Sequence, residues 1–531
     1  MPGFSPYSRS VFGLTCSLML LALGTQAQQN LNLVGHLPYS SNLSDVWGYV
    51  APDGREYALI GAFDGVSVVD LLDPAAPVEV AFLPGFGSIW RDLKVWGTHA
   101  YATNETGGGL AILDLSNLPV SVDTSSYRER DLRTAHNLYI DSQGIAYLFG
   151  ANIDNGGVTM LDLNPDPEQP VFLGAYTTRY VHDAFVRNDT LWTAEIQEGE
   201  FSIVDISVKS SPVILGTQKT PIGLTHNAWL SDNGAVLAIS EEYPAGHIVT
   251  YDVTDPADIE ELGRYRSNWS TNIIPHNVFF MGNWLVTSYY RDGVTLTDAT
   301  RPENLVGTGV FDTSPFSSDG EFNGCWGVYP YLPSGLILAT DIEEGLFVLR
   351  PTYVRGAYLE GTVRESGSGT PRLYARVEIL GSDARPYITD FSGQYRTGTA
   401  DSGLFTVRVA ASGCGTAFIP DVLLQPGEVT VLDIDLACTG TALPPVVEFT
   451  PEIRVDPAVF SGSATLSWRL ESLWQPGANV SVWNAGGQLV STETLSGGDG
   501  QQLIGGDWPA GTYLLLLRSG GFVQSIKAIK L

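Results

Sequence analysis

One short pattern, a glycine followed after four residues by an aspartate, recurs along the first two-thirds of the chain. The complete copies are Gly65–Asp70, Gly109–Asp114, Gly157–Asp162 and Gly293–Asp298, and three degenerate copies are Glu200–Asp205, His247–Asp252 and Gly345–Arg350. Each copy alternates apolar and polar residues as a strand does, and the copies lie roughly 45 residues apart, the period of a four-stranded propeller blade. The sequence therefore predicts a β-propeller of seven blades, in which the repeated aspartates cap tight turns.

A second recurring pattern predicts how the propeller closes. Val171-Phe-Leu-Gly174, at the expected fourth strand, reappears as Val213–Gly216 and, ahead of the first repeat, as Leu33-Val34-Gly35. A strand at the chain start that matches an outer blade strand can complete the last blade and leave no sheet edge open. We therefore expect a closed propeller over residues 28–352.

Composition supports an all-β fold and excludes one class of partner. The 531 residues include 58 Gly and 31 Pro but only 16% charged residues, and no sustained helical periodicity follows the N-terminus. This composition suits many short strands and turns. The formal net charge of −30 would repel nucleic acid, so we expect no nucleic-acid partner.

The N-terminal residues are typical of a cleaved signal peptide. One basic residue, Arg9, precedes the apolar run Val11–Leu23, and Thr25-Gln26-Ala27 forms a small-x-small cleavage signal. We expect residues 1–27 to be removed on export, and no other segment is apolar enough to span a membrane. Export permits a disulfide, for which Cys414 and Cys438 are the predicted pair, leaving Cys325 as an odd thiol.

Residues 353–440 predict a small β-sandwich. The strands Tyr358–Val363, Ala375–Ile379 and Leu404–Arg408 alternate with turn residues, among them Asp390-Phe-Ser-Gly393-Gln-Tyr395. This segment resembles the carboxypeptidase regulatory-like, or transthyretin-type, domain, and the resemblance implies a rigid spacer.

A linker, residues 441–452, leads to a last module over 453–531. The module contains Gly487-Gln-Leu-Val490 and Pro509-Ala-Gly-Thr-Tyr513, and it ends with Lys527 and Lys530. These motifs resemble the C-terminal sorting domain of type IX secretion. The resemblance implies a second small β-sandwich, a partnership with that secretion machinery, and passage through the periplasm to the outer-membrane surface or the extracellular space.

Alignment of the predicted blades places four of the seven histidines in one column at the start of the first strand. That column reads Trp47, Arg91, His136, His182, His226, His276 and Trp326, and the next reads Gly48, Asp92, Asn137, Asp183, Asn227, Asn277 and Gly327. A third column, at the end of the second strand, reads Ala62, Glu105, Ala151, Glu195, Glu241, Tyr289 and Asp341. First and second strands are antiparallel neighbours, so these columns surround one mouth of the central channel. The remaining histidines are interpreted as surface or packing residues.

Four imidazoles around one mouth predict a metal or polar-ligand site. Imidazole binds Zn, Cu and Fe, and carboxylates, which Mn prefers, either ligate or orient an imidazole ring. The predicted ligands are His136, His182, His226, His276, Glu105, Glu195, Glu241 and Asp341. The alternative is that the His-Asn and His-Asp pairs are structural, with the imidazoles packed between blades.

The repeats resemble the LVIVD repeat of the choice-of-anchor B family, with Ser202-Ile-Val-Asp205 as a close copy. The resemblance implies a secreted or surface propeller and carries no catalytic residues. We therefore hypothesise an exported binding propeller for an extracellular protein, glycan or small molecule. A metal-dependent hydrolase or oxygenase, with Glu195 or Glu241 as general base and Arg91 stabilising an anion, is one alternative. A structural adhesin with an inert channel is another.

Overall fold

The structure is a computed structural model. It describes residues 28–268, 272–316, 320–382, 384–438, 452–457, 459–470, 479–484, 489–495, 498–519 and 522–531. The predicted signal peptide, residues 1–27, lies outside these residues, as does the predicted linker up to position 451.

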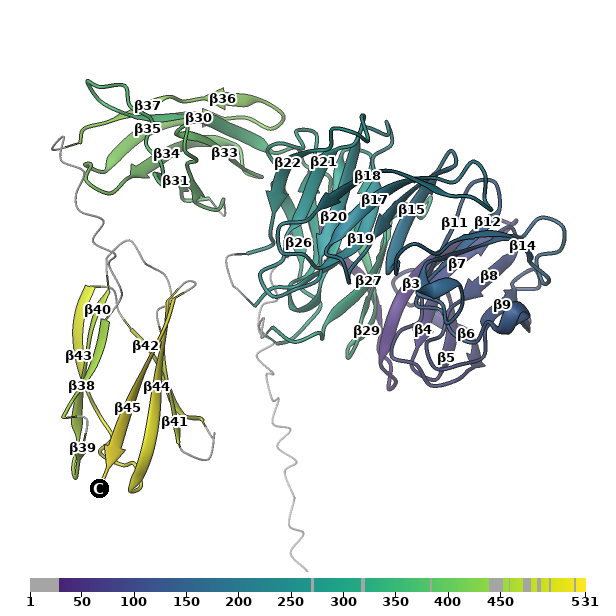
Figure 1. Cartoon of the computed structure of the whole chain (residues 1–531), viewed down its shortest axis with the longest axis horizontal. Helices are drawn as coiled ribbons and strands as arrows, with labels where there is room; N and C mark the ends of the chain where they lie inside the picture. The colour runs from purple at the N-terminus through teal and green to yellow at the C-terminus, as the bar shows by residue number, and fades with distance from the viewer. Residues whose placement is uncertain are drawn as a thin grey trace, which may run out of the picture.

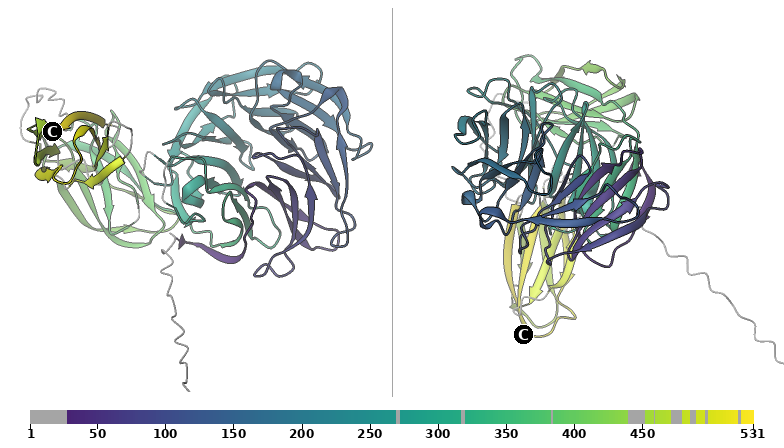
Figure 2. Two further views of the ribbon diagram at one scale, coloured as in Figure 1. Left: turned by 90° about the horizontal axis from the view of Figure 1, so that it is seen from below. Right: turned by 90° about the vertical axis from the view of Figure 1, so that its right-hand side faces the viewer.

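Seven antiparallel sheets built from residues 28–351 surround a common axis (Figure 2, left). In each sheet the first strand lies innermost, and the first strands of neighbouring blades contact one another around the whole ring. The prediction of an all-β chain with a seven-bladed propeller is confirmed.

The first three blades are β3 (Leu43–Val50), β4 (Glu56–Ala62), β5 (Gly65–Asp70) and β6 (Val78–Pro84); β7 (Leu93–Trp96), β8 (His99–Ala102), β9 (Leu110–Asp114) and β10 (Asp123–Tyr127); and β11 (Asn137–Ile140), β12 (Ile145–Phe149), β13 (Val158–Asp162) and β14 (Val171–Tyr176). Blades 4 and 5 are β15 (Asp183–Arg187), β16 (Thr190–Ala194), β17 (Glu200–Asp205) and β18 (Val213–Lys219); and β19 (Thr225–Leu230), β20 (Val236–Glu241), β21 (Ile248–Asp252) and β22 (Glu260–Tyr265). Blade 6 is β23 (Pro275–Met281), β24 (Trp284–Tyr289), β25 (Gly293–Asp298) and β26 (Val306–Phe311), and blade 7 has β27 (Cys325–Tyr329), β28 (Ile337–Asp341) and β29 (Gly345–Pro351). Short 3-10 turns occur at Glu129–Asp131, Asp154–Gly156 and Tyr290–Asp292.

The N-terminal strand closes the ring as the repeated sequence indicated. β2 (Leu31–Leu37) pairs antiparallel with β29 and forms the outer strand of blade 7. A further strand that the sequence did not indicate, β1 (Gln28–Gln29), pairs with β26 and gives blade 6 a fifth strand.

Blades 3, 4 and 5 are each held against the next blade by a glycine in the fourth strand. A Cβ atom added at Gly174, Gly216 or Gly263 would lie 2.0, 1.9 or 2.5 Å from a backbone carbonyl oxygen of the loop that follows the third strand of the next blade. Only glycine lets these backbones approach so closely. The repeated aspartate fixes the same loops from within, as at Asp205, where Oδ1 accepts a 2.8 Å hydrogen bond from the Ser207 backbone N–H.

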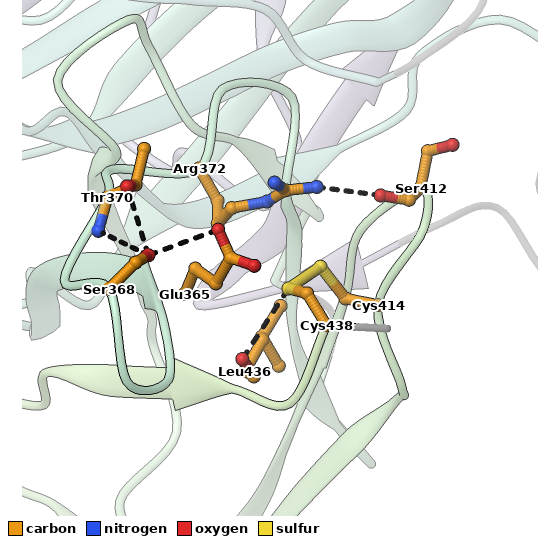
Figure 3. Close-up of a disulfide and its surroundings, with 8 residues drawn as sticks. All are labelled: Glu365, Ser368, Thr370, Arg372, Ser412, Cys414, Leu436 and Cys438. Atoms are coloured by element: carbon orange, nitrogen blue, oxygen red, sulfur yellow. Dashed lines mark hydrogen bonds between the residues drawn. A yellow bond between two sulfur atoms is a disulfide. The ribbon is translucent and has the colours of Figure 1, made fainter. Parts of the chain in front are cut away.

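The segment after the propeller folds into two sheets. One contains β33 (Gln394–Thr399), β30 (Ala357–Glu365), β36 (Val429–Val431) and β37 (Ile434–Leu436), and the other contains β32 (Tyr387–Ile388), β31 (Arg376–Leu380), β34 (Gly403–Ala410) and β35 (Ala417–Leu424). Apolar side chains of both sheets form one core, including Leu359, Val377 and Val407. The predicted pair Cys414 and Cys438 is disulfide-bonded beside this core (Figure 3).

This sandwich lies beside the propeller (Figure 1) and is bound to blade 6 by ion pairs and hydrogen bonds. The blade 6 repeat aspartate, Asp298, accepts hydrogen bonds from Arg355 Nε at 3.0 Å and from the Gly356 N–H at 2.7 Å. Arg301 bonds both carboxylate oxygens of Glu360, and Asn304 bonds the same carboxylate. The sandwich is thus attached through the repeat itself.

The last described strands also form two sheets. The first is β38 (Glu452–Asp456), β40 (Ala464–Leu470) and β43 (Gly498–Ile504), and the second is β39 (Val459–Phe460), β45 (Phe522–Lys530), β44 (Gly511–Ser519), β41 (Asn479–Asn484) and β42 (Leu489–Thr494). Their shared core includes Leu466, Val480 and Leu515. Within the described residues, no helix is both long and apolar enough to cross a membrane.

Candidate metal centre

The four column histidines lie at the inner ends of blades 3 to 6, where hydroxyl groups hold their backbones. His136 and His182 immediately precede β11 and β15, and His226 and His276 are the second residues of β19 and β23. Thr103 Oγ1 donates to the carbonyl oxygen of His136 at 3.1 Å, and Ser240 Oγ donates to that of His276. Because Thr103 directly follows β8 and Ser240 lies on β20, each in the preceding blade, contact between blades sets the positions of His136 and His276.

The four imidazoles form a continuous arc around the axis. Successive ring centroids are 4.0 Å apart from His136 to His182, 4.5 Å from His182 to His226 and 4.3 Å from His226 to His276. Trp326 follows at 4.3 Å, and Trp90 completes the circle at 6.4 Å from Trp326 and 6.5 Å from His136. We call these six side chains the axial ring. The sequence columns correctly brought the histidines together.

Most ring nitrogens that face away from the axis are engaged. His226 Nδ1 lies 3.2 Å from the carbonyl oxygen of His276, and His276 Nδ1 lies 2.7 Å from that of Trp326. A carbonyl can only accept, so each Nδ1 carries the proton and each Nε2 keeps its lone pair, the tautomer that a metal ligand needs. His136 Nδ1 is 2.5 Å from Glu105 Oε1. His182 Nδ1 is buried and has no hydrogen-bond partner among the described residues.

A carboxylate that the columns missed approaches the imidazoles. Glu242 directly follows β20, and its two oxygens lie 3.6 Å from His226 Nε2 and 3.8 Å from His276 Nε2. Ligand atoms of His182, His226 and Glu242 all lie within 4.8 Å of one another. The Tyr290 hydroxyl donates to Glu242 at 2.5 Å. Burial raises the pKa of Glu242 to about 7.

Five side chains of the axial ring, all but His182, border a cavity of about 20 Å³ at the channel centre. This volume is enough for one water molecule or one ion. Asp92, Asn137 and Asn277, from the column after the histidines, line the cavity together with the ring. The side-chain oxygen of Asn277 is buried without a hydrogen-bond partner in the described part of the chain. Nitrogen and oxygen donors therefore surround a space of atomic size.

Charged groups close the channel beyond this cavity. The Lys94 ammonium pairs with Asp92 and lies 3.8 Å from Asp45, and Asn227 Nδ2 donates to Asp183 at 2.6 Å. Burial lowers the pKa of the Lys94 ammonium, but the two aspartates outweigh this effect, so the net pKa is raised. Lys94 therefore stays charged and balances part of the negative charge of Asp45 and Asp92.

His182, His226 and His276 are neutral at ordinary pH. Burial, followed by repulsion from neighbouring imidazoles, lowers the pKa of His182 and His226 well below the usual value. Burial also lowers the pKa of His276 to about 3. Neutral imidazole is the form that binds metals, so the arc needs little deprotonation before it can accept an ion.

Three of the four predicted carboxylate ligands have other partners in the structure. Glu195 is buried against Arg179 Nη1 at 2.6 Å and Thr193 Oγ1 at 2.8 Å. Glu241 accepts a 2.5 Å hydrogen bond from a backbone N–H, that of Ile222, and lies 3.4 Å from His247 Nδ1.

Asp341 has similar local partners. It accepts hydrogen bonds from Thr313 Oγ1 at 2.7 Å and from the Glu343 N–H at 3.0 Å. All three carboxylates therefore hold the loops of their own blades, whereas Glu105 contacts the arc through His136.

Arg91 and Trp47 belong to the histidine column of the sequence, but their side chains do not join the axial ring. The Arg91 guanidinium bonds backbone carbonyls, including that of Phe86 at 2.8 Å, so Trp90 supplies the side chain of the axial ring. Trp47 packs deeper in the channel, with Lys94 Nζ 4.3 Å from its ring centroid. Cys325 is buried, and burial raises the pKa of its thiol.

Comparison with known proteins supports two of the resemblances. Residues 196–220, which contain β17 and β18, match the LVIVD repeat, and residues 358–437 match the carboxypeptidase regulatory-like domain. These two assignments are confirmed. No curated protein matches the chain.

One similar solved structure is the β-propeller domain of Myceliophteria thermophila Cps50 (Swd1). It shares 15% sequence identity at a TM-score of 0.43, over 61% of this chain and all of that one. The fold assignment rests on the seven sheets described above.

Proposed function

We propose that this chain is an exported β-propeller binding protein whose axial ring holds one divalent transition-metal ion. The observation that carries the proposal is the arc of four imidazoles, three of which, His136, His226 and His276, line a cavity of about 20 Å³. Packing between blades would account for buried histidines. It does not account for the buried polar atoms of His182 and Asn277, which lack hydrogen-bond partners among the described residues.

The donor set favours a particular group of metals. The Nε2 atoms of His226 and His276 carry lone pairs because their Nδ1 atoms face carbonyls, and Glu242 adds one carboxylate beside them. Imidazole-rich sites suit Zn, Fe or Cu, whereas Mn prefers oxygen ligands. His136, His182, His226, His276 and Glu242 are the residues that would hold the ion.

The metal content of the mature chain, residues 28–531, tests this proposal. Replacing His226 and His276 by alanine should remove about one equivalent of metal per chain, since binding needs the lone pairs of these rings. Plasma mass spectrometry after reconstitution with Zn²⁺, Fe²⁺ or Cu²⁺ measures the loss. His247→Ala is the matched control, because His247 contacts Glu241 outside the arc. Circular dichroism checks that each variant is folded.

An unchanged metal content in the folded double variant would contradict the proposal. So would a wild-type chain in which none of the bound metal depends on His226 and His276. Either result would favour a structural adhesin with an inert channel and would direct the search to extracellular partners.

One observation favours an enzyme as the second candidate. A bound transition metal can activate water, and the Glu242 carboxylate, held by Tyr290, lies beside the imidazoles where a proton would have to be taken up. Glu242 therefore replaces Glu195 and Glu241 as the candidate general base, and Arg91, bound to carbonyls, no longer fits the role of anion stabiliser. Loss of hydrolytic turnover in Glu242→Gln, with metal retained, would separate an enzyme from a binding protein.

We infer that the chain is exported and carried across the outer membrane. The N-terminal signal sequence supports the first step, and the motifs Gly487–Val490 and Pro509–Tyr513 support sorting by type IX secretion. The layout of a choice-of-anchor B propeller agrees with this route. A truncation after Leu443 should accumulate in the periplasm, as cell fractionation would show. Its appearance outside the cell would argue against the sorting assignment.

A further inference from the structure

A second group of ligating side chains lies at the face of the propeller opposite the axial ring. His99 begins β8 and Asp114 ends β9, and the two residues face each other in register. Glu168 lies in the loop between β13 and β14 of blade 3. One ligand atom from each of the three side chains lies within 4.8 Å of the other two. Blades 2 and 3 together therefore provide one nitrogen and two carboxylate donors at a single point.

The other blades provide an internal comparison for this site. In each of the six blades whose repeat ends in aspartate, a residue of the second strand faces that aspartate. These residues are Tyr57, His99, Ile145, Thr190, Val236 and Trp284. Only blade 2 places a histidine there, so the fold of the repeat does not require an imidazole at this position.

Glu168, the third donor, is held by hydrogen bonds in its own loop and across the contact between blades 2 and 3, which we call the seam. Tyr101 on β8 donates from its hydroxyl to the carbonyl oxygen of Pro167 at 2.9 Å. The Glu168 N–H donates to Asp166 Oδ1 at 3.0 Å. The loop of blade 3 is thereby fixed over blade 2, with Glu168 next to the His99 and Asp114 pair.

We propose that this seam binds Zn²⁺ through His99, Asp114 and Glu168. One imidazole nitrogen and two carboxylate oxygens are ligands that Zn²⁺ accepts, and water can complete a four-coordinate shell. The ion would connect the second and third strands of blade 2 to the outer loop of blade 3. The site shares no residue with the axial ring, so it does not rest on the proposed axial metal.

Acylation of histidine by diethyl pyrocarbonate, followed by peptide mass spectrometry, tests the seam in the full mature chain. A metal-bound imidazole does not react, so saturating Zn²⁺ should slow labelling of His99 about tenfold, corresponding to roughly 90% occupancy. His36 is the internal control, since it is exposed and its Nε2 contacts the carbonyl oxygen of Glu344. Because labelling is read residue by residue, metal at the axial ring does not affect the result.

Two substitutions make the test specific to the proposed ligands. Glu168→Gln should abolish the protection of His99. Glu303→Gln, at the same Pro-Glu position of the blade 6 loop, should leave the protection unchanged. Equal labelling of His99 with and without Zn²⁺, or full protection in Glu168→Gln, would overturn the proposal.

Discussion

Replacement of Asp298 by alanine is expected to lower the free energy of unfolding by about 3 kcal/mol and to release the sandwich from blade 6. The Asp298 side chain is fully buried, and its carboxylate bonds the Gly356 N–H and both the N–H and Oγ1 of Thr300. Removing it leaves the buried Gly356 donor without a partner. Arg355 is 36% exposed, so its ion pair adds little to this figure.

Urea unfolding of wild type and variant measures the loss, and limited proteolysis near residue 355 reports release of the sandwich. Asp252→Ala is the matched control, because Asp252 has the same place in its repeat but caps only its own turn at Thr254, a contribution of about 1 kcal/mol. Equal losses in the two variants would show that the contact with the sandwich adds nothing to stability.

The effect of Asp298 should also depend on pH. Burial would raise the pKa of Asp298, but hydrogen bonds from Thr300 and Gly356 outweigh burial and lower it from 3.8. The folded protein therefore prefers the ionised form, and this stabilisation is present above the unfolded pKa and lost as pH falls through the folded one. The difference between wild type and Asp298→Ala should remain at pH 5 and shrink below pH 3.8.

Substitution of Gly216 by alanine is expected to cost about 3 kcal/mol or more, because the new methyl group overpacks a backbone contact. Its Cβ would lie 1.9 Å from the carbonyl oxygen of Pro256, which belongs to the next blade and cannot rotate away as a side chain would. Blades 4 and 5 would have to separate. Thermal and urea unfolding of the mature chain measure the cost.

Gly282→Ala separates this contact from the general cost of losing a glycine. Gly282 has a φ of +58° but nothing within 4 Å of an added Cβ, so its replacement should cost only about 1 kcal/mol of backbone strain. A Gly216 variant no less stable than the Gly282 variant would mean that the blades are not held together by this contact.

The sequence predicted the fold and the imidazole arc because both follow from repetition. A column of residues at one position of every blade must surround the axis, so four histidines in a column had to meet. Glu242 escaped this reasoning because a bulge between Thr225 and Asn227 shifts the pairing of the first two strands of blade 5. The residue beyond the expected strand end, rather than Glu241, then faces the axis.

Other parts of the site depend on contacts that a repeat alignment does not contain. Arg91 occupies the column, but its guanidinium bonds carbonyls, including that of Phe86, and Trp90 takes its place in the ring. The Glu195 carboxylate pairs with the nearby guanidinium of Arg179 instead of contacting the arc. Thr103, Ser240 and Ser288 place a hydroxyl near the end of the second strand, where it bonds a backbone carbonyl of the next blade. This recurrence is a signal that the sequence alignment could have revealed.

The pairing of β2 with β29 gives the propeller a fixed order of assembly. The outer strand of the last blade is Leu31–Leu37, far from the rest of its blade in the sequence, so blade 7 cannot be completed until the chain has been made as far as Pro351. The four strands of each of blades 3 to 6, which carry the imidazole arc, are contiguous in the sequence, and β1 only adds an outer fifth strand to blade 6. A growing chain could therefore assemble its histidines before the ring is closed, and closure would be the step that traps whatever the channel holds.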